Sequence, residues 1–155
     1  MRIERQSFPT HWTVKAYLNE LSNRAAIYIV AAVGDRDAGT ERVLGYGGLW
    51  LIMDEAHITT IAVVPELRGR KIGDRILCRM LQAVQDRGGA RATLEVRETN
   101  TPALRLYEKY GFEYVAVRKA YYEDTKEDGH ILWINDMTSP EWRRRFAANR
   151  AAVGL

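Results

Sequence analysis

The stretch VVPELRGRKIGDRIL, residues 63–77, decides the fold. It leaves an apolar run, turns at Pro65, passes three arginines and two glycines, and enters a segment with helical periodicity. A strand that feeds a glycine-bearing turn and then the N-terminus of a helix is a common way to hold a phosphate group. Lys71 stands where such a turn often carries a second close glycine. Two interpretations therefore remain open, an anion cradle and a basic surface turn that leads into a helix.

The segments on either side of this turn predict a strand–helix–strand unit. Residues 56–64 are rich in β-branched side chains, which favours a strand. The apolar residues of 72–87 recur at helical spacing, and Gly88-Gly89 ends the helix. Residues 90–97 alternate between apolar and polar, so a second strand is expected there. The two strands should be parallel, with a right-handed connection.

The remaining chain predicts further strands, each joined to its neighbour by a short link. We expect a helix over 13–22 with Thr13 as its N-cap, and a short helix that Thr101 caps, with Pro102 at its first position. The other predicted elements are a buried strand over 26–33, a strand over 42–52 with a glycine bulge or close approach, strands over 112–118 and 129–136, and a helix over 139–152. These elements predict an α/β (α+β) fold in which a mixed sheet carries helices on both faces.

Composition limits the classes of function. A chain of 155 residues is expected to form one domain, and its net charge of +3 does not by itself indicate a nucleic-acid partner. The single cysteine, Cys78, excludes an intrachain disulfide and fits a reducing compartment. No apolar stretch approaches the roughly 20 residues of a membrane span, and MRIERQSF lacks the apolar core of a signal peptide. We expect a cytoplasmic protein without a membrane partner.

Several stretches together resemble a known family. They are HITTIAVVP followed by ELRGRKIG, then TLEVRETNTPALRLYEKYGF (93–112) and RKAYYEDTKEDGHILW (118–133). They resemble the GNAT superfamily of acetyl-CoA-dependent N-acetyltransferases over about residues 3–137, and above all its RimI-like branch, the ribosomal-protein-alanine N-acetyltransferases. The family signature Arg/Gln-x-x-Gly-x-Gly/Ala falls on Arg68 to Gly73, with Lys71 at the first glycine. The resemblance implies a mostly antiparallel sheet with a central, splayed parallel pair.

The chain departs from the family pattern in three places. Families of this type usually open with a strand, whereas IERQSFPTHW resembles the first helix and the loop after it, so that strand is missing or supplied differently. EDG (127–129) replaces a more usual acidic-acidic-alanine run. The segment from 139 lies beyond the common core, so we divide the chain into an acetyltransferase domain, 1–138, and a basic helical tail, 139–155.

The reaction that the resemblance implies is attack of a neutral amine on the thioester of acetyl-CoA, which needs a base, an oxyanion donor and an acid. Glu95 is the candidate base, acting through water. Its alternative is a solvated carboxylate or an ion pair with Arg97. Tyr107 is the candidate acid and a cofactor contact, and its alternative is a core aromatic residue.

The cofactor, acetyl-CoA or CoA, is expected to lie along the parted strands and over the turn. The segment Ile61, Ala62 and Val63 would supply backbone contacts to its amides and the oxyanion donor. The residues expected around the pyrophosphate are Arg68, Gly69, Arg70, Lys71, Ile72, Gly73 and Asp74. Among these, Asp74 is expected to contribute only its backbone, and the β-carbon of Lys71 requires its φ to stay negative. Asn100 resembles a cofactor contact, with an ordinary helix-start residue as the alternative.

The expected acceptor is a protein N-terminus, and the resemblance implies the alanine N-terminus of a ribosomal protein. Tyr121 and Tyr122 would lie over this acceptor site; their alternative is a pair of surface aromatics. Two rival functions remain open: acetylation of a small amine or lysine side chain, and a non-catalytic protein that binds CoA or a partner. An open cleft near Tyr121, Tyr122 and residues 8–12 would favour a peptide. Retention of both Glu95 and Tyr107 argues against the non-catalytic reading.

Other conspicuous residues carry less weight. His11, His57 and His130 lack metal-ligand spacing, so no metal site is expected. Cys78 lies among polar helix positions and lacks a partnered base. EWRRRF (141–146) reads as a solvated basic helix rather than an RNA contact. The sequence leaves the true acceptor and the oligomeric state open.

Overall fold

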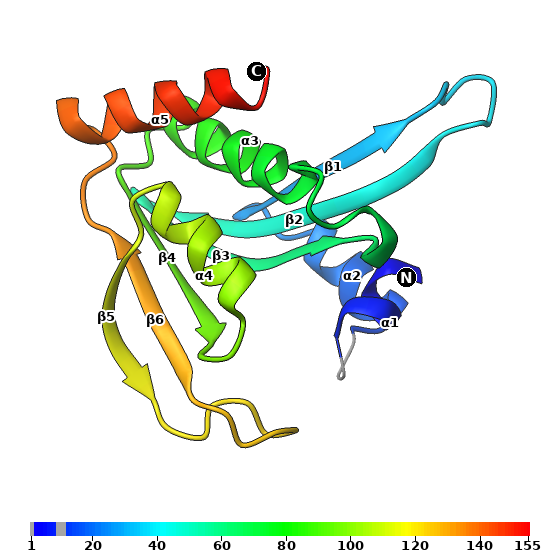
Figure 1. The fold of residues 1–155 in the computed structure, drawn as a ribbon. Helices are drawn as coiled ribbons and strands as arrows, with labels where there is room; N and C mark the ends of the chain where they lie inside the picture. Colours follow the sequence, from blue (N-terminus) through cyan, green and yellow to red (C-terminus); the bar gives the residue numbers. More distant parts are fainter. Residues whose placement is uncertain (1, 9–11) are drawn as a thin grey trace.

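The structure, a computed structural model, describes residues 2–8 and 12–155. Its helices are α1 (Arg2–Ser7), α2 (Val14–Leu21), α3 (Ile72–Asp86), α4 (Thr101–Lys109) and α5 (Pro140–Ala152), with a short 3-10 turn at Pro65–Leu67 (Figure 1). Its strands are β1 (Ala26–Val33), β2 (Arg42–Ile52), β3 (Glu55–Val63), β4 (Arg91–Arg97), β5 (Glu113–Arg118) and β6 (Gly129–Ile134). None of the described helices is both long and apolar enough to cross a bilayer.

The six strands form one sheet in the order β1-β2-β3-β4-β6-β5. Every neighbouring pair is antiparallel except β3 and β4, which are parallel. The parallel pairing runs only from Glu55 opposite Arg91 to Ile58 opposite Leu94. Beyond that point β3 continues to Val63 and β4 to Arg97 without pairing to each other, so the two strands part. The predicted mixed sheet and its splayed parallel pair are confirmed.

Helix α3 covers one face of the sheet because its predicted apolar stripe fits there. Ile76, Leu77, Met80 and Leu81 are buried in the main core. The sheet comes close to α3 at Gly47, where a β-carbon would clash with the sulfur of Met80. The register of β2 against β3 shifts just after Gly48. The expected glycine bulge and close approach are therefore both present in β2.

Helices α1 and α2 lie on the other face, and a buried carboxylate ties them to the sheet. Glu4 of α1 accepts hydrogen bonds from the backbone N–H of Trp12, at 3.1 Å, and from the hydroxyl of Tyr17 in α2, at 2.8 Å. It also accepts one from the hydroxyl of Tyr46 in β2. Thr13 caps α2 as predicted, accepting from the backbone N–H of Ala16. The described chain begins with α1, and no described strand precedes it.

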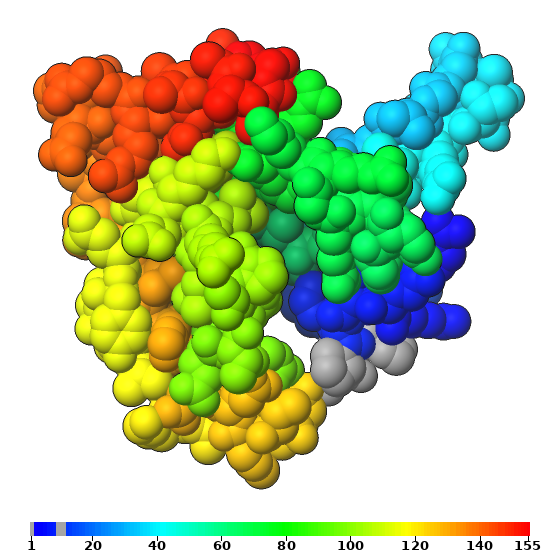
Figure 2. Space-filling view, viewed as in Figure 1, coloured from blue at the N-terminus to red at the C-terminus, as the bar shows by residue number. Residues whose placement is uncertain are grey.

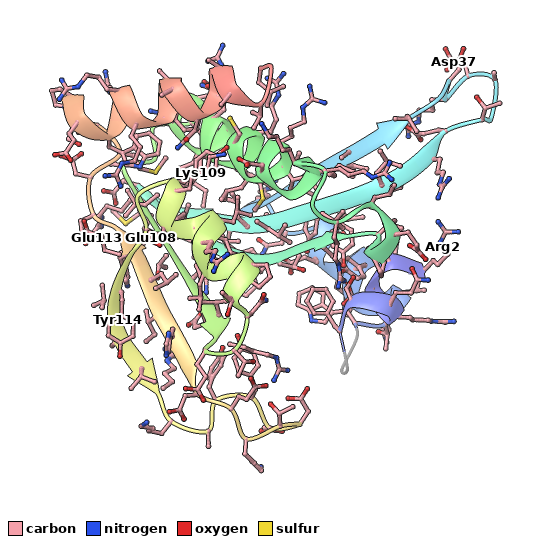
Figure 3. All side chains as sticks on the ribbon, in the orientation of Figure 1. Arg2, Asp37, Glu108, Lys109, Glu113 and Tyr114 are labelled. Carbon is pink, nitrogen blue, oxygen red and sulfur yellow. The ribbon has the colours of Figure 1, made fainter. Side chains whose placement is uncertain are left out.

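Strand β1 corrects the prediction of a buried strand over 26–33. It is the edge of the sheet, and of its residues only Ile27 is fully buried, while Val30 and Val33 are more than half exposed. Its β-branched residues correctly indicated a strand but carried no information about where that strand lies in the sheet. The β1–β2 hairpin projects from the body, with Asp37 at its far end (Figures 1 and 3).

Helix α5 packs on α3 and joins the same core as the rest of the chain (Figure 1). Ser139 caps it as expected, while Trp142 and Phe146 are buried and their rings stack 4.9 Å apart. The indole N–H of Trp142 donates to the backbone oxygen of Tyr110 at 2.9 Å. The basic helix that was expected to be solvated is therefore exposed on one face and buried on the other. The boundary at 138/139 stays a prediction.

Two further local predictions were wrong. The N-cap of α4 is Asn100, whose side-chain oxygen accepts from the backbone N–H of Ala103 at 3.3 Å, and Thr101 is already helical. Asparagine is among the best N-cap residues, so it displaces its neighbour. Cys78 is buried, and this burial raises the pKa of its thiol. It faces the core with Leu77 and Leu81, so the expectation that it lies among polar helix positions was wrong.

Candidate active site

A cleft runs through the point where β3 and β4 part. One end, about 500 Å³, lies over the β3–α3 turn, and the other, about 810 Å³, lies under the segment 121–124. Both ends are lined by Ser7, Phe8, Ile61 and Asn100, so they are continuous. Figure 2 shows the surface hollowed between the green β3–α3 turn and the yellow-green residues of α4. These volumes lie in the range of about 300–1,000 Å³ typical of ligand sites.

The turn at 68–74 opens α3 without a side-chain cap. Lys71 occupies the N-cap position with φ 60° and ψ 13°, and Gly69 also has positive φ. The expectation that Lys71 keeps φ negative was therefore wrong. A non-glycine residue enters the left-handed region at a cost of about 1–2 kcal/mol, which the surrounding fold tolerates. The first backbone N–H groups of α3 remain unbonded by any cap and, with the helix dipole, favour an anion.

The side chains around this turn are mostly engaged with the protein. Arg68 donates from Nε to the backbone oxygen of Val63 at 3.3 Å, and Lys71 from Nζ to that of Ala152 at 3.3 Å. Asp74 accepts from Lys109 Nζ and from the Tyr110 hydroxyl, each at 2.6 Å (Figure 3 labels Lys109). The carboxylate of Asp74 is thus occupied, in line with the expectation that only its backbone meets a ligand.

The parted strands offer main-chain groups to a ligand. Ile61, Ala62 and Val63 pair with β2 on one side and line the α3 end of the cleft on the other. Among the described residues no strand pairs with them on that second side. Together with the free amides of α3, they fit an elongated molecule that has amide groups at one end and phosphates at the other. Ile72, Gly73 and Asn100 line the same cavity, but Arg70 does not.

Glu95 lies just beyond the last paired residues of β3 and β4, and it does not pair with Arg97. Its Oε2 lies 2.7 Å from Nε2 of His57 on β3, and its Oε1 lies 3.5 Å from a guanidinium nitrogen of Arg118. The hydrogen bond with His57 lowers the pKa of Glu95 and raises that of His57, and Arg118 lowers the pKa of Glu95 further. The carboxylate is therefore ionised and held from two sides.

Tyr107 lies on α4 and is 8% exposed, within the wall of the larger cavity. Its ring packs edge-on against Phe112, with centroids 5.6 Å apart. Burial raises the pKa of its hydroxyl, so the phenol is protonated near neutral pH. No hydrogen bond from this hydroxyl to the described residues is present, which leaves it free to meet a ligand in the cavity. The core-aromatic alternative holds for the ring but leaves the hydroxyl unexplained.

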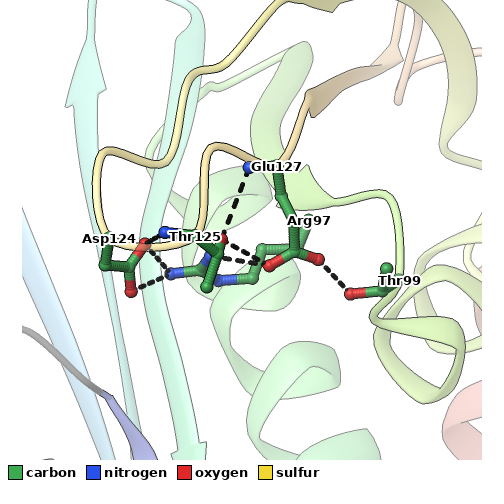
Figure 4. Close-up of polar contacts among 5 residues, drawn as sticks. All are labelled: Arg97, Thr99, Asp124, Thr125 and Glu127. Atoms are coloured by element: carbon green, nitrogen blue, oxygen red, sulfur yellow. Dashed lines mark hydrogen bonds and ion pairs between the residues drawn. The ribbon is translucent and has the colours of Figure 1, made fainter.

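A network of polar contacts around Arg97, drawn in Figure 4, holds the segment that follows Tyr121 and Tyr122. Arg97 donates to both carboxylate oxygens of Asp124, at 2.9 and 2.7 Å, and to Glu127 at 2.9 Å. Its guanidinium carbon lies 3.9 Å from the centroid of the Tyr122 ring. Hydrogen bonds, the largest from Thr125, lower the pKa of Glu127. The end of β4 therefore fixes the segment that covers the cavity.

The structure thus brings Glu95, Tyr107, Tyr121 and Tyr122 to the larger cavity. The adjoining cavity is lined by Ile61 to Val63 and by all of 68–74 except Arg70. Sequence reasoning missed His57 and Arg97. Their partners lie 27 to 38 residues away along the chain, and no local motif marks them. The strand register was the only available signal for His57, because parallel strands place it near Glu95. Of the expected acceptor segment 8–12, residues 9–11, including His11, lie outside the described residues.

Comparison with known proteins bears on the family of this chain. Residues 1–112 match the family model described as "Acetyltransferase (GNAT) family". A Bacillus subtilis protein named as a putative ribosomal protein bS18-alanine N-acetyltransferase is 38% identical over 133 residues, covering 85% of this chain and 84% of the relative. An Escherichia coli ribosomal protein bS18-alanine N-acetyltransferase is 27% identical over 132 residues, covering 84% of each.

Solved structures share the fold. The crystal structure of the Escherichia coli ribosomal-protein-S18-alanine N-acetyltransferase has a TM-score of 0.77 at 25% identity, covering 90% of this chain and 87% of that one. A PaiA N-acetyltransferase from Thermoplasma acidophilum, solved in complex with coenzyme A, has a TM-score of 0.63 at 21% identity over 78% of this chain and 70% of that one. The family expected from the sequence is confirmed. The chain belongs to the GNAT family of acetyltransferases and is an acyltransferase.

Proposed function

We propose that this enzyme transfers an acetyl group from acetyl-CoA to the α-amine of a protein N-terminus, and that the acceptor is the alanine N-terminus of a ribosomal protein. The observation that carries the proposal is the continuous cleft through the parted β3–β4 seam. Free helix amides lie at one end of it, and Glu95, Tyr107 and two tyrosines lie at the other. The names of two relatives support the acceptor class.

Acetyl-CoA supplies an acetyl group that is activated as a thioester. Its pyrophosphate would meet the backbone N–H groups of 69–74, with Arg68 and Lys71 adding positive charge. Its pantetheine would lie along Ile61 to Val63, and a backbone N–H of this strand would face the carbonyl oxygen as negative charge develops there. Asn100 would border the pantetheine, although its side-chain oxygen is already bonded as the N-cap.

Glu95 would take a proton from the acceptor's ammonium group through a water molecule. The amine nitrogen then bonds to the acetyl carbon, the carbon–sulfur bond breaks, and the departing thiolate takes a proton from the hydroxyl of Tyr107. The attacking nitrogen gives up its second proton as the carbon–sulfur bond breaks, and that proton returns through solvent to the phenolate oxygen of Tyr107. The products are the N-acetylated chain, the CoA thiol and the proton that Glu95 first took, so protons and electrons balance. Tyr107 suits this role because its burial keeps the phenol protonated until a thiolate appears.

Tyr121 and Tyr122 would line the path of the acceptor chain. A tyrosine offers a flat apolar face and a hydroxyl, which suits the backbone and first side chains of a peptide. The cavity beneath them, about 810 Å³, has room for more than a bare amine. A cytoplasmic location follows from the proposal, since ribosomal proteins and acetyl-CoA meet there.

The test is an acetylation assay against peptides that begin with Ala, Ser or Met, each also made with a blocked N-terminus and an internal lysine. We expect the free Ala-initiated peptide of a ribosomal protein to be acetylated fastest and the blocked peptides not at all. Preferential acetylation of the blocked, lysine-bearing peptides or of free polyamines would contradict the N-terminal proposal. Mass spectrometry of the products identifies the modified nitrogen in each case.

A further inference from the structure

The net positive charge of the chain lies on one side of the fold, where α5 packs against α3 (Figure 1). Residues 139–155 hold four arginines and one acidic residue, a net charge of +3 that equals the formal charge of the whole chain, so residues 1–138 are neutral as a group. Helix α3 adds two exposed arginines beside this segment. The exposed residues that we call the α3–α5 basic surface are Arg75, Arg79, Arg143, Arg144 and Arg150.

Contacts between the two helices make this a continuous surface. Arg75 donates from Nε to the backbone oxygen of Val153 at 2.9 Å, and Arg150 donates to the amide oxygen of a glutamine in α3 at 3.0 Å. Arg79 and Arg150 approach the thiol of Cys78 from the two helices, and their charges oppose the rise in its pKa that burial causes. Arginines that are about 70 residues apart along the chain therefore lie side by side.

The arginines of the α3–α5 basic surface lack acidic partners. Arg97, by contrast, is held by two carboxylates. Among the described residues, none of the five arginines forms an ion pair. Arg75 and Arg79 lie about one turn apart on α3, and Arg143 and Arg150 about two turns apart on α5, so like charges repel along both helices. Contacts within the described chain do not relieve this repulsion, whereas a bound polyanion would.

The surroundings of the arginines indicate which kind of polyanion fits. None of the exposed large apolar side chains among the described residues belongs to α3 or α5. A helix that lies on a membrane needs an apolar face, and a protein interface needs aromatic or aliphatic anchors. A single-stranded nucleic acid needs exposed aromatic rings on which its bases stack. The backbone of a duplex needs only cations, and the planar guanidinium group of arginine can bind two phosphate oxygens at once.

We propose that the α3–α5 basic surface binds the phosphate backbone of an RNA duplex without reading its sequence. The choice of RNA rests on the function proposed above, because an acceptor that is a ribosomal protein lies among helices of ribosomal RNA. None of the five arginines lines either cavity of the cleft, so docking leaves acetyl-CoA binding untouched. The sequence of 141–146 alone favoured a solvated helix, and the structure adds the two arginines of α3 beside it.

The test measures the affinity of the full chain for a fluorescent RNA duplex of about 20 base pairs, between about 50 and 200 mM salt. One triple variant removes three cations of the surface: Arg143→Gln, Arg144→Gln and Arg150→Gln. The matched control removes the same charge from exposed positions beside β1 and β2: Arg24→Gln, Arg36→Gln and Arg42→Gln. Thermal melts check that both proteins fold, and the single variant Arg79→Gln replaces the first triple variant if it does not.

We expect the affinity of the first triple variant to fall at least tenfold at the lowest salt. The slope of log affinity against log salt should decrease in magnitude by about 3, or about 1 for each arginine removed. The control should stay within about twofold of the wild type. An unchanged affinity in the first variant, or equal losses in the two, would overturn the inference. So would displacement of the RNA by acetyl-CoA, because the RNA would then be bound at the turn of 68–74.

Three competitors separate the duplex from other partners: single-stranded RNA of the same length, polyglutamate, and vesicles that contain phosphatidylserine. Each should bind more weakly than the duplex at equal salt, and tighter binding of any of them would overturn the choice of a duplex. Purified small ribosomal subunits should bind the wild-type chain, and their failure to do so would contradict the ribosomal source. All these measurements need no acceptor, so failure to acetylate N-terminal peptides would contradict the proposed function separately.

Discussion

The α3 end of the cleft is lined by main chain, whereas the end beneath residues 119–128 is held by charged side chains. At the α3 end the groups that face a ligand are amides of 69–74 and of β3, and nearby side chains such as Asp74 are bonded elsewhere. At the other end Arg97, Glu95 and His57 hold the walls through ion pairs between distant segments. The first end should tolerate side-chain changes that the second does not.

Tyr107→Phe should have the largest effect, because it removes the proposed proton donor in the wall of the larger cavity. We expect kcat to fall about 100-fold or more, with acetyl-CoA affinity almost unchanged. Steady-state kinetics and calorimetric titration measure the two quantities. Tyr114→Phe is the control, since Tyr114 lies exposed on β5 (Figure 3). Undiminished turnover in Tyr107→Phe would remove this residue from the acid role.

Arg97→Ala should weaken acceptor binding at one end of the cleft and leave acetyl-CoA binding at the other end unchanged. It leaves Asp124 and Glu127 without their cation and Tyr122 without its stacking partner, so the segment over the cavity loosens. We expect KM for the acceptor peptide to rise about tenfold, equivalent to about 1.4 kcal/mol, while acetyl-CoA affinity stays the same.

Lys119→Ala is the matched control for Arg97→Ala. Its ion pair with Asp128 is close, but the lysine side chain is 79% exposed, and exposed pairs contribute little. An equal rise in KM for the two variants would show that the segment responds to any lost charge. A fall in acetyl-CoA affinity in Arg97→Ala would show that the two ends are not independent.

Substitutions at Lys71 should have the smallest effect and test the main-chain character of the α3 end. Lys71→Gly relieves a left-handed residue but frees the unfolded chain, so its stability should stay within about 1 kcal/mol of wild type. Lys71→Val should be clearly less stable, because a β-branched residue is disfavoured at positive φ. Thermal melts with and without acetyl-CoA measure stability and binding together. A Lys71→Val enzyme as stable as wild type would contradict the left-handed turn.

Much of the α3 end could be predicted from sequence because it is local. The strand, turn and helix over 56–87 are consecutive, and the apolar spacing from Ile72 to Val84 fixes which face of α3 is buried. The left-handed conformation of Lys71 could not be predicted in the same way, because lysine disfavours the positive φ that the fold imposes on it. The family resemblance, rather than periodicity, assigned the candidate roles of Glu95 and Tyr107.

The acceptor end could not be predicted because its contacts join residues far apart in sequence. An ion pair between Arg97 and Glu95 was one alternative to the base role of Glu95. Carboxylates of the segment before β6 bind Arg97 instead, and His57 lies beside Glu95. The prediction that β1 is buried was wrong for a related reason. Its β-branched content favours a strand but carries no information about the sheet edge. In each case tertiary contacts decided which partner a side chain has or whether it is buried, and the local sequence pattern carries no information on either.

The most direct test is a crystal structure of the enzyme with acetyl-CoA, which would show whether the ligand lies in the gap between β3 and β4. The diphosphate should be bound by backbone N–H groups of 69–74, and the pantetheine with its acetyl group should lie between residues 59–63 and 95–97. A diphosphate held away from that turn, or strands that pair along their full length with the ligand outside them, would contradict this placement.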